Sequence, residues 1–147
     1  MNASRPLRPF LLLALALAVA VPAAAQSVRK VDPQHVSDYW ILLNQKVDID
    51  IPYGGHNLDK PGCAVVTYTI GSDGVPRDLS VAKVVPNGDF GQVAMSAVSN
   101  FRYGPTLSNR TSAPVATYYI VPFNAPAGPG GQQQVMAPCK LTGYATD

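Results

Sequence analysis

The chain has 147 residues, which is enough for one folded domain and too few for two. It carries 11 basic and 9 acidic residues, and every acidic residue is aspartate. Because Arg5 and Arg8 lie in a predicted leader, the rest of the chain has 9 basic residues (11 − 2) against 9 acidic ones. A neutral domain lacks the electrostatic footprint of a nucleic-acid-binding protein. The absence of glutamate also removes the general acid or base that glycosidases and zinc peptidases use most.

Residues 1–25 are predicted to be a signal peptide that is cleaved near Ala25. Arg5 and Arg8 form a short basic region, residues 10–21 form an uncharged apolar run, and Ala23-Ala24-Ala25 supplies the small residues before the cleavage site. An uncleaved anchor helix is the alternative, but the run is shorter than the roughly 20 apolar residues that a bilayer requires. We therefore expect an exported protein without a stable membrane anchor.

Cys63 and Cys139 are the only cysteines. In an oxidising compartment an even pair predicts a disulfide bond, and the alternative is two unrelated thiols. Closing so long a loop stabilises a fold by about 4–5 kcal/mol in the chain-entropy description.

Residues 26–52 are predicted to hold a short helix and a short strand. Asp32-Pro33 is typical of a helix start, and apolar and aromatic side chains recur at helical spacing as far as Leu43, which predicts a helix over 33–44. Residues 47–51 then alternate valine or isoleucine with aspartate, as a strand does. Residues 52–62 contain Gly-Gly and Pro-Gly pairs and are expected to be a loop.

The next block predicts the order strand, strand, helix, strand. Residues 63–70 alternate with one strongly apolar face, Gly71-Ser72-Asp73-Gly74 predicts a hairpin turn, and a second strand is expected over 78–85. Asp89 is a predicted N-cap for a helix that Gly104-Pro105 ends. Residues 115–123 alternate again and predict a third strand.

These elements predict an α+β fold: a three-stranded antiparallel sheet (β-β-α-β) with one packed helix, plus the short N-terminal helix. The sheet is antiparallel throughout only if the strand 63–70 is central, which leaves the strand 115–123 at an edge with unpaired backbone groups. Residues 124–147 form a tail rich in proline, glycine and glutamine that cannot fold alone. A Cys63–Cys139 disulfide would hold it against the domain.

The block over 53–123 resembles the C-terminal domain of the TonB family, the energy transducers of Gram-negative envelopes. The resemblance rests on four ordered motifs: the glycine-led alternating strand after Gly62, the hairpin at Asp73-Gly74, the run Phe101-Arg102-Tyr103-Gly104-Pro105, and the last strand ending at Pro122-Phe123. It implies a periplasmic location, no enzymatic activity and a place in TonB-dependent transport across the outer membrane.

The edge strand leads to a hypothesis of peptide or protein binding by β-augmentation, in which a partner's extended segment pairs with the strand edge. The resemblance implies that the partner is a segment of an outer-membrane receptor or another envelope protein. The expected partner-binding residues are Val115, Thr117, Tyr118, Tyr119, Ile120 and Val121. Three alternatives remain open: an edge blocked by the tail or by residues 46–51, a homodimer formed through that edge, and a structural or scaffolding subunit of an envelope complex without a transport role.

The sequence offers weak candidates for catalysis and none for a cofactor or a metal site. His35 and Asp38 lie one turn apart on a predicted surface helix, and His56 lies near Asp59 in a glycine-rich loop, without further ligands at a defined spacing. Cys63 begins a strand, where a disulfide is expected more often than a nucleophile. No set of residues meets the requirement for a nucleophile, a base and an orienting group.

Overall fold

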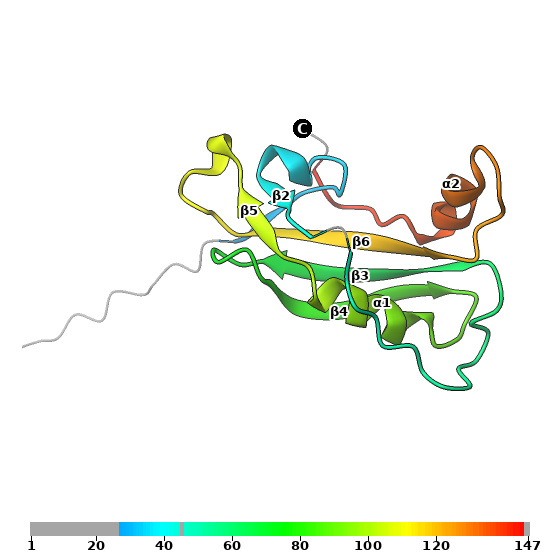
Figure 1. Ribbon diagram of the computed structural model, residues 1–147. Helices are drawn as coiled ribbons and strands as arrows, with labels where there is room; N and C mark the ends of the chain where they lie inside the picture. The colour runs from blue at the N-terminus through cyan, green and yellow to red at the C-terminus, as the bar shows by residue number, and fades with distance from the viewer. Residues whose placement is uncertain (1–26, 45, 146–147) are drawn as a thin grey trace, which may run out of the picture.

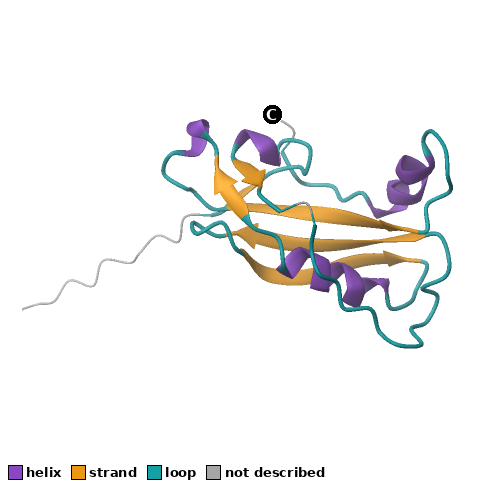
Figure 2. Ribbon diagram, in the orientation of Figure 1, coloured by secondary structure: helices purple, strands orange, loops and turns teal. Residues whose placement is uncertain are grey.

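The computed structural model describes residues 27–44 and 46–145, so the predicted signal peptide over 1–25 lies outside the described residues (Figure 1). The described elements form a four-stranded sheet with helices and a second, two-stranded sheet (Figure 2). In chain order they are β1 (Arg29–Lys30), η1 (Val36–Asp38), β2 (Trp40–Leu42), β3 (Gly62–Ile70), β4 (Pro76–Val85), α1 (Phe90–Ser99), β5 (Tyr103–Pro105), η2 (Leu107–Asn109), β6 (Val115–Phe123), α2 (Gly131–Met136) and η3 (Ala137–Cys139).

The α+β class is confirmed, but the main sheet has four strands where three were expected. Its order is β1-β6-β3-β4, with β3 central and antiparallel to both β4 and β6. The fourth strand, β1, pairs with β6 in parallel through Arg29↔Val115 and Lys30↔Ala116. Two residues are too short a stretch to show a period of two, which is why the sequence pattern did not indicate this strand.

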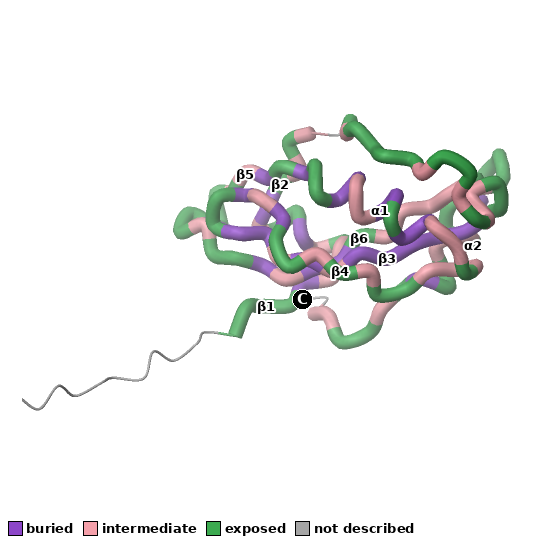
Figure 3. Tube along the Cα trace, turned by 90° about the horizontal axis from the view of Figure 1, so that it is seen from below, coloured by how far each residue is buried: buried purple, intermediate pink, exposed green. Residues whose placement is uncertain are grey.

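One face of the sheet packs on α1. The apolar side of β3, formed by Ala64, Val66, Tyr68 and Ile70, is buried in the same cluster as Phe90 and the other inward residues of α1. Alternation in the strand and the helical stripe in α1 both point their apolar side chains to this one core. Figure 3 shows the resulting run of buried positions along β3.

The opposite face of the sheet is covered by the tail, which the disulfide fixes. Cys63 and Cys139 are bonded across 76 residues of sequence, and neither side chain has exposed surface. Val65 and Tyr118 pack with them, and α2 and η3 lie over this side. The expected attachment of the tail is therefore present, although the tail also forms two short helices that its composition did not predict.

The N-terminal part differs most from the expectation. The helix predicted over 33–44 is instead the single turn η1 followed by β2, because Trp40 to Leu42 pair in antiparallel fashion with β5. The indole of Trp40 is 1% exposed and its Nε1 donates to the carbonyl of Ala113 at 3.1 Å. Of the side chains at helical spacing, Val36 and Trp40 are in the core as expected, whereas Leu43 is 66% exposed.

The strand predicted over 47–51 is also absent from the structure, which has no regular secondary structure there. The backbone amide of Asp50 donates to Ser96 Oγ at 3.0 Å, and the carbonyl of Asp48 accepts from Asn100 Nδ2 at 2.8 Å. Side chains of α1 and its C-terminal end therefore hold this segment in place of a strand ladder.

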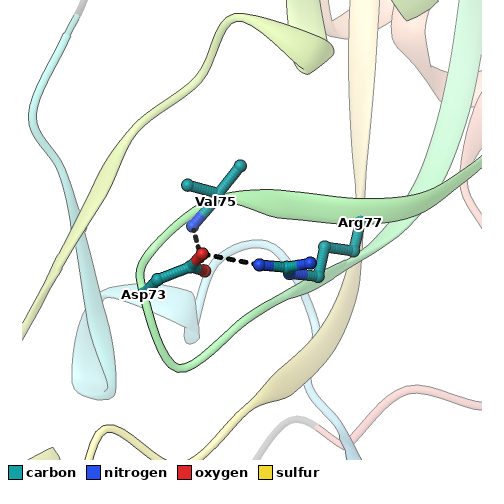
Figure 4. Close-up of polar contacts among 3 residues, drawn as sticks. All are labelled: Asp73, Val75 and Arg77. Carbon is teal, nitrogen blue, oxygen red and sulfur yellow. Dashed lines mark hydrogen bonds and ion pairs between the residues drawn. The ribbon is translucent and has the colours of Figure 1, made fainter.

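The turn between β3 and β4 is formed as expected, with Gly74 at a φ of +76°. Figure 4 shows the carboxylate of Asp73, which accepts from the amide of Val75 at 3.2 Å and pairs with Arg77 at 2.6 Å. These two contacts, the amide first, lower the pKa of the Asp73 carboxyl. The carbonyl of Gly74 also accepts from the Tyr103 amide at 2.9 Å, which ties the turn to the start of β5.

Candidate functional site

The outer edge of β6 divides into a covered part and an open part. The amide of Val31 donates to the carbonyl of Ala116 at 2.9 Å, so Ala116 presents its backbone groups to β1. The β3–β6 register is regular from end to end, and the backbone amides and carbonyls of successive residues point to opposite sides of a strand. Tyr118 and Ile120 therefore present their backbone amides and carbonyls to the same side as Ala116, away from β3. Within residues 27–44 and 46–145, no backbone or side-chain hydrogen bond reaches those amides and carbonyls from outside the sheet.

The expectation of an open edge along the whole of β6 is therefore wrong at its first two residues. There β1 occupies the edge, and then the chain turns away at Asp32 and Pro33. Tail residues 124–145, the part that the structure describes, do not pair with β6. Instead Ala145 pairs with Val31 on the far side of β1, through backbone bonds to Lys30 and Asp32.

A groove of roughly 400 Å³ lies along the open part of β6. Asp32, Pro33 and Gln34 form one wall of the groove, where the chain leaves β1. The tail forms the other wall, and Figure 1 shows it running beside β6 with α2 near the end of that strand. The tail residues that line the groove are Gln133, Met136 and Lys140.

The six predicted partner-binding residues have different surroundings. Val115 and Thr117 are buried, and the hydroxyl of Thr117 donates to the carbonyl of Val31 at 2.8 Å. Val121 packs against the core on the α1 side. Tyr118, Tyr119 and Ile120 all line the groove. The structure therefore brings three of the six together at the groove and places the other three in the core or under β1.

Tyr118 links the groove to its walls. Its hydroxyl donates to Asp32 Oδ2 at 3.3 Å, and its ring meets the ring of Tyr144 edge-on at 4.8 Å between centroids. Burial, followed by the negative charge of Asp32, raises the pKa of the Tyr118 phenol. The phenol therefore stays neutral at physiological pH and remains a donor.

A smaller cavity of roughly 240 Å³ adjoins the groove on the side of η1 and β2. Most of its lining is aromatic and aliphatic, and it shares Pro33, Tyr118 and Tyr119 with the groove. At its base the hydroxyls of Tyr68 and Tyr103 form a buried hydrogen bond of 2.6 Å. Burial raises the pKa of Tyr103 to about 12 and raises that of Tyr68 well above its ordinary value.

The weak catalytic candidates do not assemble into a site. The amide of His56 donates to Asp89 Oδ2 at 2.7 Å, so the predicted cap residue Asp89 holds this loop and makes no side-chain cap on α1. His35 precedes η1, where its backbone forms the turn bonds to Asp32 and Asp38. Cys63 is in the disulfide. In the part of the chain that the structure describes, no group of three or more histidine, cysteine or acidic side chains could hold a metal ion.

Sequence reasoning missed the walls of the groove. Asp32, Pro33 and Gln34 were assigned to a helix start, and the tail was expected only to be tethered. The position of Cys139 was the available signal, because a disulfide to the start of the central strand must bring the neighbouring Lys140 close to the sheet.

No helix among the described residues is both long enough and apolar enough to span a bilayer. The described residues form an α+β domain with an antiparallel β-β-α-β block and an accessible strand edge. A family model for the Gram-negative bacterial TonB protein C-terminal matches residues 56–124. Residues 56–124 are therefore similar to this family, as the sequence motifs indicated.

Among solved structures, the solution NMR structure of the Pseudomonas aeruginosa TonB C-terminal domain is similar to the chain at 22% sequence identity, with a TM-score of 0.42. The match covers 60% of this chain and 89% of that one. The comparison with curated proteins gave no match.

Proposed function

We propose that this protein is a periplasmic binding module of the TonB type, which takes an extended segment of an outer-membrane receptor onto the open edge of β6. The match of residues 56–124 to the TonB C-terminal family supports a TonB-type role in envelope transport. The observation that carries the proposal is the pair of outward-facing residues on β6, Tyr118 and Ile120, whose backbone groups have no partner among the described residues and lie in a groove.

Backbone pairing would supply most of the affinity. Adding a strand to an open edge satisfies amides and carbonyls on both partners, which is the basis of β-augmentation. The open edge runs from Tyr118 to Pro122, and Pro122 can accept a hydrogen bond but has no amide to donate. At a rise of about 3.3 Å per residue the usable edge is about 13 Å long. The groove therefore suits a short segment.

The side chains around the edge would supply selectivity. Ile120 and Met136 give the groove apolar contact area, while Gln34 and Gln133 offer amides. The covered end is fixed by β1, so an incoming strand would continue along the line that β1 leaves at Asp32. We expect the chain to reach this compartment by means of the signal peptide predicted over 1–25.

Crosslinking in intact cells tests the proposal. A photoreactive residue at Ile120 faces the groove, whereas one at Lys83 lies on β4 at the opposite edge of the sheet and is the matched control. We expect an outer-membrane receptor to be captured from position 120 and not from position 83. Equal capture from both positions, or capture from 120 without any receptor, would refute the proposal.

A scaffolding role is the second candidate, and the segment over 46–54 favours it. Its isoleucines are exposed, Ile49 at 43% and Ile51 at 70%, and the side chain of Tyr53 is fully exposed. Exposed apolar side chains that gather in one segment outside regular secondary structure are typical of a contact surface. A stable complex that the double substitution Ile49→Ser and Ile51→Ser disrupts would favour this role, and a homodimer would appear as a doubled molar mass in light scattering.

A further inference from the structure

The cavity beside η1 and β2 is lined by aromatic rings and holds no charged side chain. The buried side chains of Trp40, Tyr68 and Tyr103 belong to its lining. The exposed side chains of Ile41 and Tyr119 also line it, so the cavity opens to solvent. No lysine, arginine, histidine or acidic residue is among the described residues of this lining. Because burying a charge without a partner is costly, such a cavity favours an uncharged molecule.

The hydroxyls of Tyr68 and Tyr103 carry one more hydrogen than their mutual bond uses. Both side chains are more than nine-tenths buried, at 4% and 7% exposure, and their oxygens lie 2.6 Å apart, so one hydroxyl donates to the other. Burial raises the pKa of both phenols, which therefore keep their protons at neutral pH. Among the described residues, no other hydrogen bond reaches either hydroxyl. Since a buried donor without an acceptor is unfavourable, a ligand with an acceptor oxygen would satisfy the remaining hydrogen.

The volume of the cavity fits one aromatic ring with a short substituent. An apolar protein cavity of about 150 Å³ holds benzene. Here the volume is roughly 240 Å³, which leaves space beside the ring. Aromatic rings pack favourably against one another in edge-to-face or offset arrangements, and Trp40 and Tyr118 provide such rings in the lining. Size and lining together favour a monocyclic aromatic compound.

The groups around the cavity disfavour ionised ligands. The carboxylate of Asp32 lies outside the lining, where it accepts from the hydroxyl of Tyr118 at 3.3 Å, and it would repel an anion. A cation would have no acidic partner in the lining and could not accept the free hydrogen of the phenol pair. An uncharged ligand avoids both penalties.

From this arrangement we infer that the cavity is a binding site for a small uncharged aromatic compound that carries a carbonyl oxygen. Tyr68 or Tyr103 donates the free hydrogen to that oxygen, while the surrounding rings pack on the aromatic part of the ligand. The inference goes beyond the proposed function, because it requires neither the open edge of β6 nor a protein partner.

Titration with three probes tests the inference on the full chain, purified after export. Acetophenone has the ring and the carbonyl, α-methylstyrene has the same shape with a methylene group in place of the oxygen, and benzoate has a negative charge. Binding is followed by NMR through the indole N–H of Trp40, which lines the cavity and is the only tryptophan of the chain. We expect acetophenone to shift this signal until it saturates, and benzoate to leave it unchanged over the same range of concentration.

Two variants separate the contact with the carbonyl from the greater hydrophobicity of α-methylstyrene. The double variant Tyr68→Phe and Tyr103→Phe keeps both rings and removes both hydroxyls, a change that leaves no buried donor unpaired and preserves the fold. We expect the ratio of acetophenone affinity to α-methylstyrene affinity to fall about fivefold, which corresponds to about 1 kcal/mol for one neutral hydrogen bond. Tyr53→Phe, at a fully exposed tyrosine outside the cavity, is the matched control and should leave the ratio unchanged.

An unchanged ratio in the double variant, or an equal fall in the control, would overturn the inference, because the two hydroxyls would then not donate to the carbonyl. It would also be overturned if acetophenone failed to shift the Trp40 signal up to its limit of solubility, or if benzoate bound as tightly as acetophenone. These results leave the proposed function untouched, since crosslinking from position 120 tests that separately.

Discussion

Removing the disulfide should weaken the fold strongly. In the double variant Cys63→Ala and Cys139→Ala, the 76-residue closure is lost from the unfolded chain. The chain-entropy description gives about 4.5 kcal/mol for a loop of that length. Domains of this size unfold with a free energy of about 5–15 kcal/mol, so the change removes a large share of the total.

The assay is urea unfolding followed by the fluorescence of Trp40, the only tryptophan, which is 1% exposed in the folded protein. We expect the free energy of unfolding to fall by about 4–5 kcal/mol. Wild-type protein reduced in denaturant, then assayed in reductant, should match the variant. A loss below about 1 kcal/mol would refute the reasoning, because it would mean that the closure does not constrain the unfolded chain.

Three further predictions concern single positions. Burial raises the pKa of Tyr68 and Tyr103, so these tyrosines ionise at lower pH in the unfolded chain than in the folded protein. The free energy of unfolding should therefore keep its full value below about pH 10 and fall between about pH 10 and 12. Tyr103→Phe should make this fall of the free energy of unfolding with pH less steep, as measured by urea unfolding at several pH values. Gly74→Ala should cost more than Gly54→Ala in thermal unfolding, since both have a φ of +76° but only at Gly74 would the new Cβ lie 2.0 Å from the carbonyl oxygen of Tyr103; equal losses would contradict the clash. Thr117→Val should cost about 1–2 kcal/mol by removing the buried hydroxyl that bonds to the segment after β1, and an unchanged urea midpoint would show that this bond does not hold the N-terminal strand.

The sequence predicted the central block well because its periodicities are long and unambiguous. Nine residues alternate in β3 and nine in β6, and ten residues form the amphipathic helix between β4 and β5. The disulfide also followed from the count of cysteines and the expected compartment. In each case a local pattern and a tertiary requirement pointed to the same structure.

The N-terminal part was mispredicted because helical spacing does not define a helix when a strand partner is available. Trp40 and its neighbours satisfy the spacing, yet they pair with β5, which lies more than 60 residues further along the chain. Backbone pairing with a distant segment is invisible to a local pattern.

The groove could be predicted only in part. The open edge of β6 followed from topology, but its covered end depends on β1 and its wall on α2 and Lys140. These pieces come from the two ends of the described chain, and neither has a periodicity long enough to reveal it. The tail helix begins at Gly131 and follows a run of glycine and proline residues, so the composition of this segment did not favour a helix.

Amide hydrogen exchange at β6 tests the central claim most directly. A receptor segment captured by crosslinking is added to the protein at saturation, and exchange is compared residue by residue with the free protein. The account predicts slower exchange at the amides of Tyr118 and Ile120, and no change at Ala116, whose backbone already faces β1. Saturated binding with unchanged exchange at Tyr118 and Ile120 would contradict it, because the segment would then be held by side chains alone.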